Sequence, residues 1–154
     1  MTSAILLDTS FLLPSFGVDT GERIRRCLRF LAEHRREAKV CYSRYSLLEA
    51  VFILLRMLRH GRLKPEEAFT MVEAGVSTVI YSLEAVSETP TVFREALKLY
   101  EMGHKDLFDN LLYSAAVASR AYLLTVDEQL RAFIQENKLQ DITLDPENLL
   151  KKLS

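Results

Sequence analysis

Short apolar runs alternate with helical patterns along this chain of 154 residues. The runs AILL and AYLLTV are each followed by an acidic residue, and a third run, KVCY, stands between two helical stretches. Runs of this length, bounded by turn-forming residues, are typical of strands buried on both faces of a sheet. Their regular alternation with helices predicts an α/β fold of three layers, in which helices flank a central parallel sheet of about five strands. The order of the strands cannot be read from the pattern.

The helices can be placed from their periodicity and capping residues. We predict helices at about 20–39, 45–60, 65–75, 90–102, from near 106, at 127–137 and from 146 onward. Gly75 is expected to close the third helix, and the apolar run VSTVIYSL after it is predicted to be a strand. The second helix is expected to be mostly buried, with Tyr45 and Phe52 as core aromatics rather than base-stacking platforms. The second and third helices should form a protruding antiparallel pair at about 44–75, within a single domain over 1–154.

Composition fits one ordinary globular domain, since 49% of the residues are hydrophobic and 27% are charged. The net charge of -1 provides no global attraction to nucleic acid, so any charged partner must be bound locally. No uncharged stretch approaches the roughly 18 residues of a membrane helix, and the N-terminus lacks the basic start of a signal peptide. We therefore expect a cytoplasmic protein with no membrane partner.

Four acidic residues occupy informative positions. Asp8 and Asp127 each follow a predicted strand directly, and ligands of open α/β sheets bind beyond the carboxyl ends of the strands. Glu49 is the only charged residue within the apolar stretch 46–55, where an unpaired carboxylate would be costly. Asp109 lies at the start of a predicted helix. These placements predict that the four carboxylates converge at one edge of the sheet.

Each acid also has a purely structural explanation. Asp8 could cap a turn, and Glu49 stands three residues after Ser46, as in a Ser-x-x-Glu capping box. First-turn positions, favoured by the helix dipole, would explain three further acids: Asp106, Asp109 and Asp127. The four principal acids, Asp8, Glu49, Asp109 and Asp127, however, have no basic residue beside them in the sequence. Their joint occurrence favours a common site.

A cluster of carboxylates needs protons or a cation to be stable. Two carboxylates about 4 Å apart repel each other by roughly 4 kcal/mol at an effective dielectric near 20. Ligand sets made only of oxygen favour Mg2+ or Mn2+, and such ions activate water for hydrolysis of phosphodiesters. The three histidines show no zinc-ligand spacing, and phosphate-binding glycine motifs are absent from the sequence.

These residues resemble the PIN-domain nucleases, particularly the toxins of VapBC toxin-antitoxin pairs. The opening LLDTSFLL is similar to the first strand and acid of the family, and Glu49 matches the acid on the helix after the second strand. The segment DNLLYSAAVASRAYLLTVD resembles the most characteristic stretch of the family and contains Asp109 and Asp127, 18 positions apart. The resemblance spans nearly the entire chain.

The resemblance implies a metal-dependent endoribonuclease that forms a homodimer and is inhibited by a small, VapB-like antitoxin. It assigns catalysis and the binding of Mg2+ (or Mn2+) to Asp8, Glu49, Asp109 and Asp127. Auxiliary roles are predicted for Asp106, Ser10 and Thr125, the last two as hydrogen-bond partners of a carboxylate or phosphate. RNA contacts are predicted for Arg56 and Arg59. The alternative is a PIN-like module that binds RNA or protein and has little or no catalytic activity.

Overall fold

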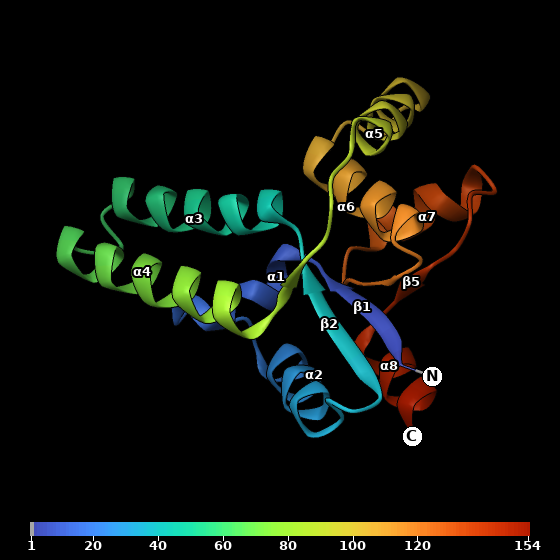
Figure 1. Ribbon diagram of the computed structural model, residues 1–154. Helices are drawn as coiled ribbons and strands as arrows, with labels where there is room; N and C mark the ends of the chain where they lie inside the picture. The colour runs from blue at the N-terminus through green and yellow to red at the C-terminus, as the bar shows by residue number, and fades with distance from the viewer. Residues whose placement is uncertain (1) are drawn as a thin grey trace.

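The computed structural model describes residues 2–154 and contains a five-stranded sheet in the order β3-β2-β1-β4-β5, with every pair of neighbours parallel. Figure 1 shows the sheet between helices. The strands are β1 (Ser3–Leu7), β2 (Ala38–Tyr42), β3 (Glu84–Ala85), β4 (Tyr122–Leu124) and β5 (Thr143–Leu144). The predicted α/β fold with a central parallel sheet is confirmed.

Helices cover both faces of this sheet and create two hydrophobic cores. In β1, Ile5 and Leu7 point into one core while Leu6 points into the other, as the two-residue period of a strand requires. The helical elements are α1 (Thr9–Leu12), η1 (Leu13–Phe16), α2 (Glu22–Glu33), α3 (Arg44–Arg59), α4 (Pro65–Ser82), α5 (Pro90–Met102), α6 (Leu107–Ala118), α7 (Glu128–Glu136) and α8 (Pro146–Leu153). Within residues 2–154, no helix is long and apolar enough to cross a membrane.

The strand order determines where a site can form. From β1 the chain proceeds outward through β2 and β3, then returns across β1 to β4 and continues to β5. The connections after β1 and β4 therefore leave in opposite directions, and such a switch point opens a crevice at the carboxyl ends of the strands. Because Leu7 pairs with Leu124, the residues that follow them, Asp8 and Thr125, meet in that crevice.

Helices α3 and α4 pack side by side and extend away from the sheet (Figure 1). The expectation that α3 is mostly buried is wrong, because the extended helix has neighbours on only part of its surface. Its buried residues form a narrow stripe of Ser46, Ala50 and Leu54. Three large apolar side chains of α3 are 42–48% exposed, namely Leu48, Phe52 and Leu55.

Helix α4 continues through Gly75 to Ser82, so the predicted stop at Gly75 and the predicted strand at 76–83 are both wrong. Gly75 is buried against the ring of Phe16 from η1, and a Cβ at this position would overlap that ring. This glycine therefore permits close packing between two elements. Helix α2 is also shorter than predicted, since it ends at Glu33 and β2 begins at Ala38.

Candidate active site

Asp8 stands at the carboxyl end of β1 and is almost fully buried. One carboxylate oxygen, Oδ1, accepts a hydrogen bond from the backbone N–H of Thr9 at 2.6 Å and caps α1. The other, Oδ2, accepts one from the hydroxyl of Thr125 at 2.7 Å. The Thr125 oxygen in turn accepts the backbone N–H of Asp127 at 3.0 Å. Thr125 thus links the two acids that end β1 and β4.

Asp127 and Asp106 are N-caps, rather than the first-turn acids that the sequence suggested. Asp127 accepts the backbone N–H groups of Gln129 and Leu130 at 2.9 and 3.1 Å and begins α7. Asp106 accepts the backbone N–H of Asp109 at 3.1 Å and begins α6. Asp109 itself does lie in the first turn of α6.

Glu49 lies inside α3 and has no capping role. The N-cap of α3 is Ser43, whose hydroxyl oxygen accepts the backbone N–H of Tyr45 at 3.1 Å. The capping box between Ser46 and Glu49 therefore does not form, and the buried Ser46 hydroxyl has no partner among the described residues. Helix formation gives no reason for a carboxylate at position 49, which leaves a role in the site as its explanation.

All five acids line one cavity of about 310 Å³ at this edge of the sheet. Its lining consists of Asp8, Thr9, Ser10, Leu13, Glu49, Ile53, Asp106, Asp109, Val126 and Asp127. The structure thus brings together the four principal predicted acids with Asp106 and Ser10, while Thr125 lies behind Asp8. None of the residues that line this cavity is basic.

Burial dominates the electrostatics of the acids. It raises the pKa of Asp8, against which the hydrogen bonds from Thr125 and Thr9 act. Burial, followed by the charges of Asp8 and Asp106, raises the pKa of Glu49 to about 7. Acidic groups are therefore concentrated where burial disfavours their charged forms.

Asp109 and Asp127 respond in opposite directions. Burial, then a hydrogen bond with Asp127 and the charges of Asp106 and Asp8, raises the pKa of Asp109 to about 9. Burial also acts to raise the pKa of Asp127, but the hydrogen bonds from Asp109, Leu130 and Gln129 outweigh it and lower that pKa. The pair accordingly shares one proton near neutral pH, and the proton resides on Asp109.

The donor set of this cavity fits a hard divalent cation. It offers carboxylate and hydroxyl oxygens only, and the buried hydroxyl of Thr9 has no hydrogen-bond partner within residues 2–154. The raised pKa values of Asp8, Glu49 and Asp109 mean that, without a cation, protons relieve part of the repulsion between the carboxylates. In the described part of the chain, no three His, Cys, Asp or Glu side chains are close enough to hold an ion as they stand.

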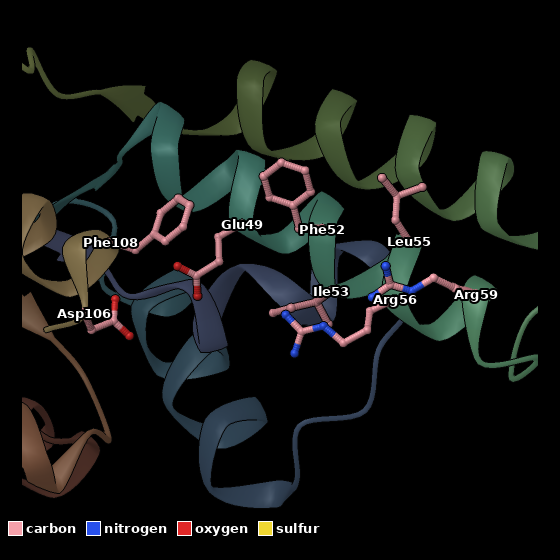
Figure 2. Close-up of a pocket in the computed structure, with 8 residues that line it drawn as sticks. All are labelled: Glu49, Phe52, Ile53, Leu55, Arg56, Arg59, Asp106 and Phe108. Carbon is pink, nitrogen blue, oxygen red and sulfur yellow. The ribbon is translucent and has the colours of Figure 1, made fainter.

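A second cavity of about 650 Å³ adjoins the acidic one and shares Glu49, Ile53 and Asp106 with it. Figure 2 shows the two predicted RNA contacts, Arg56 and Arg59, on its far side from Asp106. The remaining lining residues are Phe52, Leu55 and Phe108. The two cavities form one groove that leads from the acids to the arginines.

Three residues of this region were missed or misread in the sequence. Phe52 is not a core aromatic, since it is 48% exposed and lines the second cavity with Phe108. Asn110 is fully buried, and its amide nitrogen donates to the carbonyl oxygen of His104 at 2.7 Å. Its amide oxygen lies 2.7 Å from Nδ1 of the same histidine, so Asn110 fixes the loop that carries Asp106. The available signal was a polar residue within the apolar stretch that follows Asp109.

Comparison with known proteins gives one family and several related structures. The family model described as the PIN domain matches residues 5–134. The structure of PAE2754 from Pyrobaculum aerophilum is 21% identical with a TM-score of 0.63, over 99% of this chain and 98% of that one. VapBC2 from Rickettsia felis, bound to a DNA fragment from their promoter, is 15% identical with a TM-score of 0.63, over 92% and 98% of the chains.

A third structure is VapC20 from Mycobacterium tuberculosis, described as a toxin that cleaves the sarcin-ricin loop. It is 17% identical with a TM-score of 0.57, over 83% of this chain and 93% of that one. The search of curated proteins found no match. At these identities the structural matches establish a shared fold.

Proposed function

This chain belongs to the PIN domain family, and on that premise we propose that it is a metal-dependent endoribonuclease that hydrolyses RNA phosphodiester bonds. The observation that supports the proposal most strongly is the convergence of five acids in one cavity with no basic lining residue. A protein that only bound RNA would gain nothing from the mutual repulsion of these carboxylates. That cost is understandable if the acids bind a cation during catalysis.

Asp8, Glu49, Asp109 and Asp127 would hold Mg2+ or Mn2+, with Asp106 and Ser10 beside them. When bound, the ion would supply activation of water and stabilisation of the charge that develops on the phosphate. Thr125 orients Asp8, and the backbone N–H groups at the start of α7 orient Asp127. Glu49 would act either as a further ligand or as the base that accepts a proton from the attacking water.

RNA as the substrate, a toxin role and the partners are part of the same proposal. One matched structure is described as a toxin that cleaves the sarcin-ricin loop, and another is a VapBC assembly. We propose by analogy that a small antitoxin binds over the acidic groove and that the chain forms a homodimer. Co-expression with a small protein encoded next to this one would test the antitoxin, because a stable complex is expected.

The nuclease proposal is tested with Asp8→Asn and Asp109→Asn. Each variant keeps the shape of the side chain but removes its charge, and is expected to lose RNA cleavage in Mn2+ by roughly 100-fold or more. The matched control is Glu101→Gln, which changes an exposed acid of α5 and should cleave at the normal rate. Millimolar Mn2+ should raise the melting temperature of the wild type more than that of the two Asn variants.

Two results would contradict the proposal. Cleavage at full rate by both Asn variants would place the chemistry elsewhere. RNA binding by a wild type that cleaves no RNA in Mg2+ or Mn2+ would instead favour the binding module.

A further inference from the structure

Helix α3 presents a row of four functional side chains along the groove. Glu49, Phe52, Arg56 and Arg59 follow one another at intervals of three, four and three residues, which places them on one face of the helix. From Glu49 to Arg59 this row extends about 15 Å at the rise of an α-helix. The same face therefore carries an acid, an aromatic ring and two cations in order. This row is longer than a site for a single phosphate group would require.

The two arginines at the far end lie in the last turn of α3, where cations stabilise the carboxyl end of a helix, and the charge of Arg56 also acts to lower the pKa of Glu49. Within the described part of the chain, neither of them is held in an ion pair. Among residues 2–154, no carboxylate lies within 4.0 Å of Arg56 or Arg59. Both line the groove (Figure 2). Two cations without carboxylate partners in a groove provide charge complementarity to a polyanion, and phosphates are the groups that arginine binds best in this geometry.

Two aromatic rings line the groove: Phe52 lies between Glu49 and the arginines, and Phe108 lies between Glu49 and Asp106 (Figure 2). Phe52 is 48% exposed although α3 buries its other face, and Phe108 comes from the first turn of α6 on the opposite wall. Figure 2 shows Glu49 between the two rings. Phe52 is thus an exposed ring beside a cationic strip, and proteins stack the bases of single strands on rings in this arrangement.

We infer that Phe52 is a specificity-determining residue of this groove: a base of the RNA stacks on its ring while the backbone runs from the acids to Arg56 and Arg59. The inference rests on the proposed function, because it takes the acidic end as the place of cleavage. Bases in a duplex are already paired and stacked, so the ring would favour an unpaired base. Phe52 would thus determine specificity without touching the reacting phosphate.

A protein tail is the competing occupant. An apolar, basic tail would suit the acids and the rings, but it would meet two unpaired arginines at the far end of the groove. The charges therefore favour RNA over a basic peptide.

The test measures binding of fluorescein-labelled RNA of about ten nucleotides by fluorescence anisotropy, in the Asp8→Asn background so that the RNA is not cut. One RNA is single-stranded with all its bases, a second lacks bases at several positions, and a third is a duplex. Phe52→Leu removes the ring, and its control is Phe69→Leu, a 65% exposed residue of α4 that lies outside the groove. Arg59→Gln is compared with Arg62→Gln, which is exposed and also outside it.

Phe52→Leu is expected to weaken binding of the intact single strand roughly fivefold or more and to leave binding of the abasic strand unchanged. Arg59→Gln should weaken binding of both strands equally and reduce the salt slope by about 1. Both control variants should bind as the background protein does. A ring effect restricted to RNA that carries bases would identify stacking, which a general loss of folding cannot imitate.

Equal binding by Phe52→Leu and Phe69→Leu would overturn the inference, as would an equal loss on intact and abasic RNA. It would also be overturned if Phe52→Leu impaired only the binding of a basic, apolar synthetic peptide. The proposed function fails separately. If RNA binding depends on the Phe52 ring but the wild type cleaves no RNA in Mn2+, the inference about the groove stands and the proposed nuclease activity is wrong. If the wild type cleaves RNA but binding does not depend on the ring, the nuclease proposal stands and the inference about the groove is wrong.

Discussion

At the scale of single residues, the acids differ in what stabilises their charge. Asp8 accepts a hydroxyl and a backbone N–H, and Asp127 accepts two backbone N–H groups. Among residues 2–154, no hydroxyl or backbone N–H group donates to the carboxyl of Asp109, which instead shares a proton with Asp127. In the absence of a cation, Asp109 is therefore the acid whose ionisation costs the fold most.

We predict that Asp109→Asn stabilises the metal-free protein. The pKa of Asp109 rises from an ordinary 3.8 to about 9 on folding, so the folded state binds more protons than the unfolded state between these values. The free energy of unfolding of the wild type should therefore fall as the pH rises from about 4 to about 9. Asparagine carries no titrating proton and should remove this part of the slope, with a gain of about 1 kcal/mol or more near neutral pH.

Urea denaturation in EDTA at a mildly acidic and a mildly alkaline pH would measure this effect. The difference in unfolding free energy between Asp109→Asn and wild type should be larger at the alkaline pH. An equal or lower stability of the variant there would contradict the assignment of the shared proton to Asp109.

The sequence was sufficient to place the acids but could not predict their protonation. Asp8 and Asp127 are recognisable because each directly follows an apolar run, and position after a strand is a local property. Which acid keeps a proton depends on where Thr125 donates its hydroxyl hydrogen and on which backbone N–H groups face each carboxylate. Those partners are set by tertiary structure.

At the scale of elements, the contact between η1 and α4 depends on Gly75. We predict that Gly75→Ala destabilises the protein by about 1–3 kcal/mol, because the new methyl group would overlap the buried ring of Phe16. The usual preference of a helix for alanine over glycine, about 1 kcal/mol, acts in the opposite direction and is included in this net value. Thermal or urea denaturation measures the change.

The matched control is Ser77→Ala, an exposed position in the same helix, which should leave stability unchanged or slightly raised. Adding Phe16→Leu to Gly75→Ala should cost less than the sum of the single changes, since the smaller side chain makes room for the methyl group. Strict additivity would show that the two residues do not conflict.

The same region shows why some elements could not be predicted. Thr89 and Asp145 begin helices through hydrogen bonds within three residues, and the sequence placed both helix starts correctly. Gly75 and the apolar residues after it read locally as a stop followed by a strand. In the structure this segment is nevertheless helical, because packing against η1 requires a helix with a glycine at the contact.

At the scale of the whole molecule, strand order creates the site. Alternating strands and helices predicted the parallel sheet, but only the order β3-β2-β1-β4-β5 brings the ends of β1 and β4 together. Strand order depends on contacts between segments far apart in the sequence. Asp8 and Thr125 are separated by 117 positions and nevertheless form a hydrogen bond.

The outer surface around the end of α5 bears on oligomeric state. Two large apolar side chains of α5, Leu97 and Tyr100, are 58% and 45% exposed and, three positions apart, form a small apolar group on one face of the helix. Scattered apolar residues are ordinary on a monomer, but a group of this kind marks an interaction surface. A two-fold symmetric contact would bury the group twice. We therefore predict a homodimer through this surface, which lies on elements other than the groove-lining face of α3.

Light scattering on the purified protein should give a mass about twice the 17.7 kDa of one chain. Leu97→Glu is expected to lower that mass toward the monomer, because a charge would be buried opposite its own copy. Phe69→Glu on α4 is the control and should leave the dimer intact, although Phe69 is more exposed than Leu97. A monomeric mass at every concentration would contradict the predicted homodimer. Dissociation by Phe69→Glu alone would instead indicate that the dimer contact lies on the α3 and α4 pair, which would bring a second copy close to the groove.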